Sequence, residues 1–361
     1  MASFDNLRVL ITGACGVTSR AVVRSLRMSE EFATSALIGT DTCENTYGLY
    51  EGLYEKIYKV PHTHHASYST MMIAILEKER IDVAIIIPEL EVLTWAKQSF
   101  PVKYVVPPLA FCENSINKAT LYKNLEGTGW IPRYAIVSRE QLLQGNTDKF
   151  NQEYPLWIRD FSSGSTSGKG ALKVQNAEEL KAWVILNPAI DQFMLTEFLE
   201  GGNFACHLLY HHGTLKKIAC YERLVYFMGR VAPSGVTGNI AKGKLINQPA
   251  LVEVATQAIQ KICTDYNIEM NGIVAVDMKA DKEGKPFITE INIRHVAATS
   301  AFASAGFNLA AYQLLLVLGK EDLLSNELER KFPPDNLLLR DIDGIPTWVA
   351  SHQEPELGSF I

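Results

Sequence analysis

The sequence predicts an α/β protein whose N-terminal part is a parallel sheet and whose second half combines helices with antiparallel strand pairs. Two observations carry this prediction. Up to about residue 110, short apolar runs alternate with segments of helical periodicity, which is typical of a parallel sheet with crossover helices. In the last third, two strands of alternating polarity flank a turn at Asp281–Gly284, which is typical of an antiparallel hairpin.

The N-terminal elements follow from the apolar pattern. It predicts strands at Leu7–Thr12, Ser35–Gly39 and Val83–Ile87, and helices at Ser19–Arg27 and Tyr68–Glu79. The first turn, Gly13–Gly16, resembles a dinucleotide-binding turn, and Asp41 follows the second strand where a ribose-binding acid would lie. The same glycines serve any tight strand-to-helix turn, and Ser19 replaces the third glycine of the fingerprint. A Rossmann-like sheet is therefore expected, whether or not it binds a nucleotide.

Length and composition narrow the class of protein. The chain has 361 residues, 47% of them hydrophobic and 20% charged, with a formal charge of −6. These values predict a globular protein of two or three packed units that binds neither nucleic acid nor membrane. The six cysteines form no C-x-x-C pair, and the N-terminus carries no signal-peptide pattern, so we expect reduced thiols and a cytoplasmic location.

A glycine- and hydroxyl-rich loop divides the middle of the chain. A strand predicted at Pro155–Asp160 runs into Phe161–Gly170, and a second strand, Ala171–Val174, follows at once. A phosphate-binding P-loop would run from strand to helix instead. The loop is therefore either a mobile β lid that folds over phosphates or a plain exposed linker. Asn176 then begins a predicted helix.

The predicted C-terminal hairpin carries a charged face. A two-residue turn would place Asp277 directly opposite Glu290, with Asn292 and Arg294 on the same face. Phe287, Ile291 and Ile293 are expected on the other face, against the core. Opposed carboxylates repel unless a cation joins them, and two carboxylates with an amide oxygen suit Mg²⁺. The alternative is a solvated surface hairpin in which Arg294 neutralises the acids.

The segment Phe287–Arg294, with the stretch that follows to Asn308, resembles the metal-binding strand and helix of ATP-grasp enzymes. The likeness is greatest to one synthetase unit of the carbamoyl phosphate synthase large chain and to stand-alone carboxylate–amine ligases, and it spans roughly residues 5 to 320. The family's Glu-x-Asn-x-Arg motif is present, and Asp277 matches its metal ligand on the preceding strand. The resemblance implies ATP and Mg²⁺, with Mn²⁺ as a substitute. Asp277, Glu290 and Asn292 would be the metal ligands.

The same resemblance implies a nucleotide site. Lys118 and Arg159 match the family's phosphate-binding cations, and Glu197 matches the hinge residue that reads the adenine amine. The hinge continues through Phe198 and Leu199, whereas Asn203 stands where most members have an acid that contacts ribose. An amide can still bond a hydroxyl, so we expect altered ribose binding there. The phosphate contacts of the lid are expected from Ser163, Gly164, Ser165 and Gly168.

The resemblance also implies an order of domains and a reaction. Residues 1–110 would form a Rossmann-like domain, 111–195 the ATP-grasp entry and lid, 196–320 the half with the metal site, and 321–361 a C-terminal extension. The reaction would join a carboxylate to an amine through an acyl phosphate and release ADP and phosphate. Arg294 would stabilise the oxyanion of the tetrahedral intermediate. Candidate substrate contacts are Arg223, Arg230 and Lys242, each of which could equally be a solvated surface cation.

Two other classes of function remain as alternatives. An NAD(P)-dependent oxidoreductase would explain Gly13–Gly16 and Asp41, but no tyrosine precedes a lysine by four residues, as a short-chain reductase requires. A nucleotide-binding regulator could keep the fold without turnover. The partners expected are small-molecule carboxylate and amine substrates, and a homodimer is compatible with the sequence.

Overall fold

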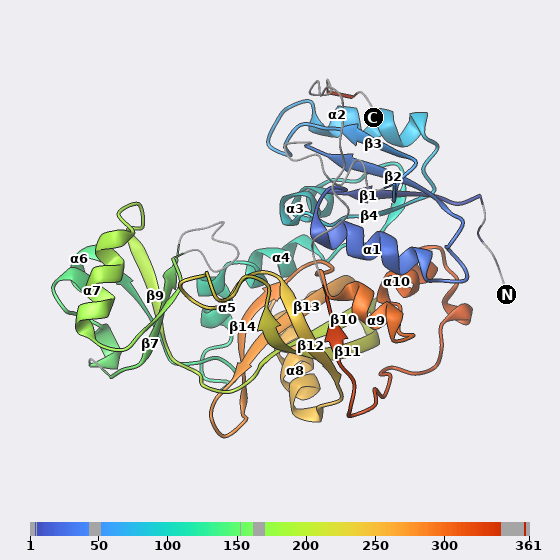
Figure 1. Ribbon diagram of the computed structural model, residues 1–361. Coiled ribbons are helices and arrows are strands. Elements are labelled where there is room, and N and C mark those ends of the chain that lie inside the picture. Colours follow the sequence, from blue (N-terminus) through green and yellow to red (C-terminus); the bar gives the residue numbers. More distant parts are fainter. Residues whose placement is uncertain are drawn as a thin grey trace.

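The computed structural model describes residues 4, 6–42, 52–151, 153–161, 170–340 and 357–358. Three sheets follow one another along the chain (Figure 1). The N-terminal sheet is blue, the second is green, and the third, yellow to red, lies below the first and beside the second in this view. Within those residues, no helix is both long enough and apolar enough to cross a membrane.

The N-terminal sheet is parallel, as predicted, with the strand order β3-β2-β1-β4-β5. Its elements are β1 (Arg8–Thr12), α1 (Val17–Arg27), β2 (Ala36–Asp41), β3 (Lys56–Lys59), α2 (Tyr68–Lys78), β4 (Val83–Ile85), α3 (Glu89–Lys97) and β5 (Lys103–Tyr104). The predicted strands and helices lie within two residues of these bounds. Gly13, between β1 and α1, has a φ of +60°, and a Cβ there would lie 2.5 Å from Cγ of Pro88. Glycine therefore lets the residues after β4 approach this turn.

The second sheet is antiparallel, with the order β6-β9-β7-β8. After the linking helices α4 (Leu109–Ser115) and α5 (Lys118–Asn124), its elements are β6 (Tyr134–Ser138), α6 (Arg139–Leu143), η2 (Asp148–Phe150), β7 (Leu156–Asp160), β8 (Leu172–Val174), α7 (Ala177–Leu186) and β9 (Gln192–Glu197). The predicted hairpin of β7 and β8 is confirmed. The predicted cap of α7 is confirmed too, since Oδ1 of Asn176 accepts from N–H of Glu179 at 2.9 Å.

The third sheet has the order β14-β13-β10-β11-β12-β15 and is antiparallel throughout. Its elements are β10 (Asn203–His211), β11 (Thr214–Tyr226), β12 (Ile240–Ile246), α8 (Pro249–Asp265), β13 (Gly272–Ala280), β14 (Pro286–Asn292), α9 (Thr299–Ser304), α10 (Leu309–Val317), η3 (Glu321–Leu323) and β15 (Leu338–Leu339). The C-terminal extension thus adds a short edge strand to this sheet. The apolar run Ile345–Ala350, which could add a further strand or cover a neighbour, lies outside the described residues.

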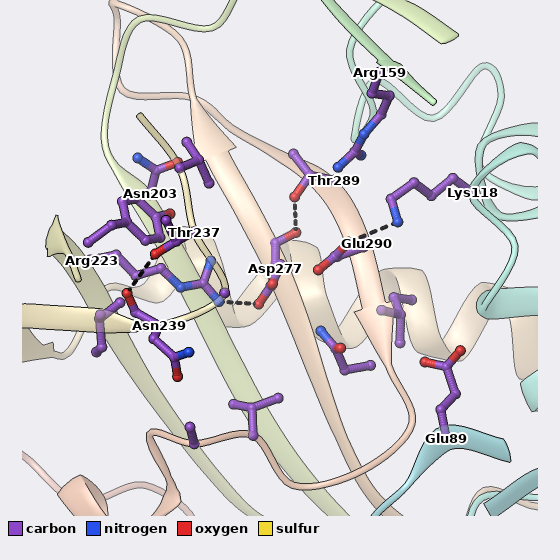
Figure 2. Close-up of a pocket in the computed structure, with 18 of the residues that line it drawn as sticks. Glu89, Lys118, Arg159, Asn203, Arg223, Thr237, Asn239, Asp277, Thr289 and Glu290 are labelled. Atoms are coloured by element: carbon purple, nitrogen blue, oxygen red, sulfur yellow. Dashed lines mark hydrogen bonds and ion pairs between the residues drawn. The ribbon is translucent and has the colours of Figure 1, made fainter. Parts of the chain in front are cut away.

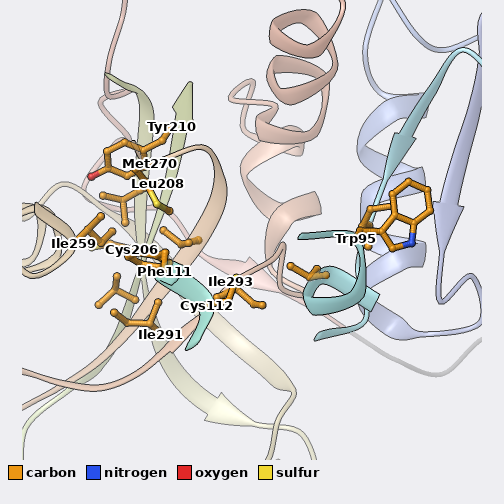
Figure 3. Packing of buried hydrophobic residues seen from close by; sticks show 14 of the residues in the cluster. Trp95, Phe111, Cys112, Cys206, Leu208, Tyr210, Ile259, Met270, Ile291 and Ile293 are labelled. Atoms are coloured by element: carbon orange, nitrogen blue, oxygen red, sulfur yellow. The ribbon is translucent and has the colours of Figure 1, made fainter. Parts of the chain in front are cut away.

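One face of the third sheet is buried, and the other is covered in part by α9 and α10 and faces a cavity over the rest. Figure 3 shows Cys206, Leu208 and Ile291 of the sheet packed with Phe111 of α4 and Ile259 of α8. The apolar side chains of β13 that alternate with Asp277 belong to the same cluster. Because strand residues alternate between faces, the polar residues of β13 and β14 point away from this core.

Helix α10 joins the third sheet to the N-terminal sheet. Ala311 and Leu314 of α10 pack with Val22 and Leu26 of α1 in one buried cluster. Nδ2 of Asn308, at the start of α10, also donates to the carbonyl oxygen of Ser25 at 2.6 Å. A shared apolar core of this kind fixes the carboxyl edge of the parallel sheet relative to the polar face of β13 and β14.

Candidate active site

A cavity of about 1090 Å³ lies where the three sheets meet. Its lining comes from the turn between β1 and α1, the start of α5, the strands β7 and β9, and the polar face of the third sheet. Small-molecule pockets usually measure roughly 300–1,000 Å³. The cavity can therefore hold a nucleotide together with a second molecule.

The predicted pairing of Asp277 with Glu290 is confirmed, although the turn that produces it is longer than expected. The N–H of Asp281 bonds the carbonyl oxygen of Lys285, and a bulge at Thr289 shifts the register back by one residue. The bulge also corrects one prediction. Phe287 pairs with Lys279 on the polar side, and Ile288 takes the core position instead, because an extra residue reverses the alternation of faces.

Two cations from other elements balance Glu290. Nζ of Lys118, the first residue of α5, lies 2.9 Å from Oε2 of Glu290. Arg159 of β7 lies close enough to act on the same carboxylate (Figure 2). Burial favours the protonated acid, but these cations outweigh it and hold the pKa of Glu290 below its usual value. Both predicted phosphate-binding residues therefore face the predicted metal site.

Asp277 is held by a third cation that the sequence did not pair with it. Nη2 of Arg223 donates to Oδ1 of Asp277 at 2.5 Å, and the two side chains are 14% and 12% exposed. Burial raises the pKa of Asp277 to about 6, and Glu290 adds to this effect whereas Arg223 opposes it. The register of β11 explains the contact, since Arg223 lies opposite Asn203 on β10 and Asp277 lies one strand further.

The side chains at the end of β14 complete a donor set that fits Mg²⁺. Asn292 and Arg294 both line the cavity beside Asp277 and Glu290. Two opposed carboxylates and an amide are hard oxygen donors of the kind that Mg²⁺ uses, with phosphates and water as further ligands. Among the described residues, no group of three or more His, Cys, Asp or Glu side chains is placed to bind a metal. The described acidic and amide side chains alone therefore do not supply the six ligands of an octahedral Mg²⁺ site.

The predicted adenine hinge lies at the end of β9. Glu197, Phe198 and Leu199 line the cavity, as does Asn203 at the start of β10. The carboxylate of Glu197 accepts from the backbone N–H of Arg133 at 2.8 Å and from its Nε at 3.2 Å. The Phe198 ring has the Nζ of Lys173 4.0 Å from its centroid. The hinge thus places an aromatic ring, with the ammonium groups of Lys173 and Lys279 over it, beside the carboxylate of Glu197 at the wall of the cavity.

Several other candidates lie at the margin of the site or outside it. Arg223 lines the cavity, whereas Arg230 and Lys242 do not belong to its lining. Oδ2 of Asp41 accepts the N–H of Cys15 at 2.8 Å, so this acid helps to hold the first turn. The lid candidates Ser163, Gly164, Ser165 and Gly168 lie outside the described residues.

A family model described as an ATP-grasp domain matches residues 116–298, which is half of the chain. The chain belongs to the ATP-grasp family. A search of curated protein sequences gives no match. The mixed α/β architecture agrees with the fold class that the sequence predicts, since solved ATP-grasp structures resemble it over most of its length.

Three solved structures illustrate that likeness of fold. The L-amino acid ligase from Bacillus licheniformis is 15% identical with a TM-score of 0.64. The match covers 90% of this chain and 78% of the ligase chain. The D-alanine–D-alanine ligase from Bacillus anthracis, complexed with ATP, is 13% identical with a TM-score of 0.54. The match covers 87% of this chain and 97% of the ligase. The third structure is the biotin carboxylase domain of 2-oxoglutarate carboxylase from Hydrogenobacter thermophilus, complexed with MgADP and bicarbonate. It is 11% identical with a TM-score of 0.58, and the match covers 86% of this chain and 69% of that domain.

Sequence reasoning missed Glu89, which enters the ATP-grasp site from the N-terminal sheet. It begins α3, shortly after β4, and lines the cavity on the same side as Lys118 and Glu290 (Figure 2). Arg294 lies close enough for its charge to act on Glu89. Burial raises the pKa of Glu89, while Arg294 and Lys118 oppose the rise. Its position after an apolar strand was the available signal, because ligands of parallel sheets bind at the carboxyl ends of the strands.

Proposed function

We propose that the protein is an ATP-dependent carboxylate–amine ligase that forms an amide through an acyl phosphate and releases ADP and phosphate. The observation that carries this proposal is the convergence of phosphate-binding cations, magnesium-type donors and an adenine hinge on one cavity. Membership of the ATP-grasp family supports the nucleotide and the general type of reaction. We also propose the domain limits 1–110, 111–195, 196–320 and 321–361.

In the proposed reaction, Lys118 and Arg159 hold the phosphates in line with the substrate carboxylate. Asp277, Glu290 and Asn292 would hold Mg²⁺, which disperses the negative charge of the phosphates when it is bound. A carboxylate oxygen of the substrate forms a bond to the γ-phosphorus, and the bond between that phosphorus and the β–γ bridging oxygen breaks, so ADP leaves. The lid, Ser162–Gly170, would keep water from the acyl phosphate.

The second half of the reaction uses the amine. Its nitrogen bonds to the acyl carbon, Arg294 stabilises the oxyanion, and phosphate leaves with the electron pair of the broken C–O bond. The amine must also lose a proton. Glu89 suits both tasks of an amine subsite, since an ionised carboxylate attracts the ammonium group and can then accept its proton.

A product assay tests this proposal. Pairs of carboxylic acids and amines are screened for release of phosphate with Mg²⁺ and ATP, and the products are analysed by mass. ADP, phosphate and an amide are expected, and hydroxylamine with the acid alone should yield a hydroxamate. AMP and pyrophosphate would mean an adenylate intermediate and would refute the acyl phosphate. Binding of ATP without turnover of any pair would favour the nucleotide-binding regulator.

The amine subsite has its own test. Glu89→Gln should lower kcat and raise the KM for the amine more than the KM for ATP, because Glu89, at the start of α3, is the proposed partner of the amine and lies away from the adenine hinge. Lys97→Ala, at the far end of the same helix, is the matched control. An unchanged KM for the amine would remove Glu89 from the site.

A further inference from the structure

The cavity continues past the pair of Arg223 and Asp277 into a region with apolar walls. This region, here called the apolar end, is lined by Tyr221, Tyr226, Val236, Ile240, Val296 and Ala298. In the view of Figure 2, Arg223 and the neighbouring Thr237 lie on one side of Asp277, and Lys118 lies on the other with Glu290. The apolar end is therefore separate from the predicted phosphate contacts.

The walls of the apolar end are the open side of a buried cluster. Tyr221 and Ile240 belong to the cluster that includes Phe302 of α9, and Tyr226 packs against it. Tyr226 lies opposite Ile240 where β11 pairs with β12. The ring of Phe302 meets that of Tyr221 edge to face, with centroids 5.9 Å apart and planes at 73°. Because packing holds these side chains in place, the apolar surface is already formed before a ligand binds.

The polar groups at this end of the cavity are bonded to one another. Nε of Arg223 donates to Oη of Tyr221 at 3.0 Å. Oγ1 of Thr237 donates to a backbone carbonyl oxygen at 2.8 Å. Nη1 and Nη2 of Arg340 donate to Oδ1 of Asn239 at 3.2 and 3.3 Å. An apolar group can enter this end and leave these bonds intact, so it avoids the cost of an unsatisfied buried polar group.

We propose that the apolar end is the subsite for a hydrophobic side chain, aromatic or branched aliphatic, of the carboxylate substrate. The inference rests on the ligase function proposed above, and it names the class of acid that the enzyme joins. The reacting carboxyl group must lie at the metal ligands, next to the γ-phosphate. Glu89, the proposed partner of the amine, lies on the same side of Asp277 as Lys118. The rest of the acid therefore extends past Arg223, where apolar walls favour a hydrophobic group.

Binding of simple acids tests the subsite without turnover. The protein is saturated with Mg²⁺ and the β,γ-imido analogue of ATP and is titrated calorimetrically with acetate, butyrate, hexanoate and 3-phenylpropionate. Each added methylene group should tighten binding roughly 3- to 4-fold until the subsite is full, as expected for burial of apolar surface. Glutarate has the shape of 5-methylhexanoate but carries a second carboxylate, so it should bind more weakly than 5-methylhexanoate.

Variants of the wall keep the test decisive. Tyr226→Ala should weaken binding of 3-phenylpropionate roughly 10-fold and change that of acetate little, because only the longer acid reaches the ring. Tyr226→Phe should restore most of the loss, since it keeps the ring without the hydroxyl group. Val236→Trp should fill the subsite and exclude 3-phenylpropionate while acetate still binds. Val225→Ala, an exposed neighbour outside the lining, is the matched control and should bind as wild type.

Two results would overturn the subsite. One is an affinity that stays constant along the acid series and in both Tyr226→Ala and Val236→Trp. The other is tighter binding of glutarate than of 5-methylhexanoate, which would mean a charged subsite instead. Unchanged binding of the ATP analogue by each variant shows that its fold is kept.

Turnover separates this inference from the proposed function. With one amine held constant, kcat/KM should rise along the acid series, and Tyr226→Ala should raise the KM for 3-phenylpropionate more than it lowers kcat. Ligation that is insensitive to the length of the acid and to Tyr226 refutes the subsite and leaves the ligase intact. Binding that tightens with length, but with no ligation of any pair, refutes the ligase and leaves the subsite.

Discussion

The buried ion pair between Arg223 and Asp277 predicts a large loss of stability when either partner is removed. Two unit charges centred about 4 Å apart attract by about 4 kcal/mol at an effective dielectric constant of about 20. Removal of one partner of a buried pair usually costs about 3–5 kcal/mol, because it leaves an uncompensated charge. We expect losses of this size in the free energy of unfolding for Arg223→Met and Asp277→Asn. For Arg223→Met, the loss in the free energy of unfolding should be larger at pH 8 than at lower pH, because at pH 8 Asp277 stays ionised opposite Glu290.

Urea unfolding without nucleotide or metal measures these losses. Trp130 is a suitable fluorescent reporter, since its carbonyl oxygen accepts the N–H of Ile288 on β14 at 2.7 Å. Mg²⁺ added together with a nucleotide should recover part of the loss in Arg223→Met and none in Asp277→Asn, because the metal needs both carboxylates. Lys261→Met breaks an exposed i,i+4 pair with Asp265 and should cost about 0.5 kcal/mol or less.

The double variant decides whether the two residues act together. Its loss should be smaller than the sum of the single losses by about 2–3 kcal/mol, the upper range for residues in direct contact. Single losses below about 1 kcal/mol that simply add would refute the reasoning. In that case Arg223 would be free to serve the substrate alone, and the charge of Asp277 would be balanced from elsewhere.

Three more predictions concern individual carboxylates and cations. Glu290→Gln should lower magnesium-dependent release of phosphate from ATP by about 100-fold or more; retained activity, with circular dichroism showing a native fold, would contradict the metal assignment. Arg159→Lys should keep measurable activity and Arg159→Ala should lose affinity for ATP, measured by titration; an alanine variant with wild-type affinity would place Arg159 outside the site. Glu91 is buried, and its pKa is raised from 4.5 to about 7, chiefly by burial. A folded pKa above the unfolded one means that stability is fully present below pH 4.5 and is lost as the pH rises through 7, so Glu91→Gln should stabilise the protein by about 3 kcal/mol at pH 8 and little at pH 5. Thermal unfolding at the two pH values checks this, and an equal gain at both would contradict it.

The N-terminal sheet was predictable because its central strands are buried on both faces. Val9 and Ile11 of β1 lie in one apolar cluster and Leu10 in the other, so the strand reads as a continuous apolar run. The edge strands gave no such signal. Lys56–Lys59 begins and ends with lysine, and Lys103–Tyr104 has only two residues. Edge strands carry charge and stay short, which hides them from a periodicity argument.

In the hairpin of β13 and β14, the predicted pairing of Asp277 with Glu290 is correct although the predicted turn is too short. A two-residue turn and a longer turn followed by a bulge both place Asp277 opposite Glu290. Only the bulge puts Ile288 in the core and Phe287 on the polar side. Nothing in the local pattern distinguishes the two, because both isoleucine and phenylalanine are ordinary on either face of a half-buried strand.

The contacts between distant elements could not be predicted from the sequence. Glu89 lies near Lys118 and Glu290 because helices such as α10 pack the two sheets together, and Arg340 lines the cavity because it follows a two-residue edge strand. Each residue on its own looks like an ordinary surface charge. The chemistry lies in their convergence, which depends on tertiary packing that local propensity does not specify.

The charges of the site are balanced in pairs before any ligand arrives. Lys118 and Arg159 act on Glu290, and Arg223 is bonded to Asp277. A divalent cation alone would have to displace Lys118 from Glu290 without offering its ammonium group a new partner. The phosphates of a nucleotide supply that partner, so Lys118 can leave Glu290 without becoming an unpaired charge. Metal and nucleotide should therefore bind far better together than separately, and the ion pair between Lys118 and Glu290 is the element that couples them.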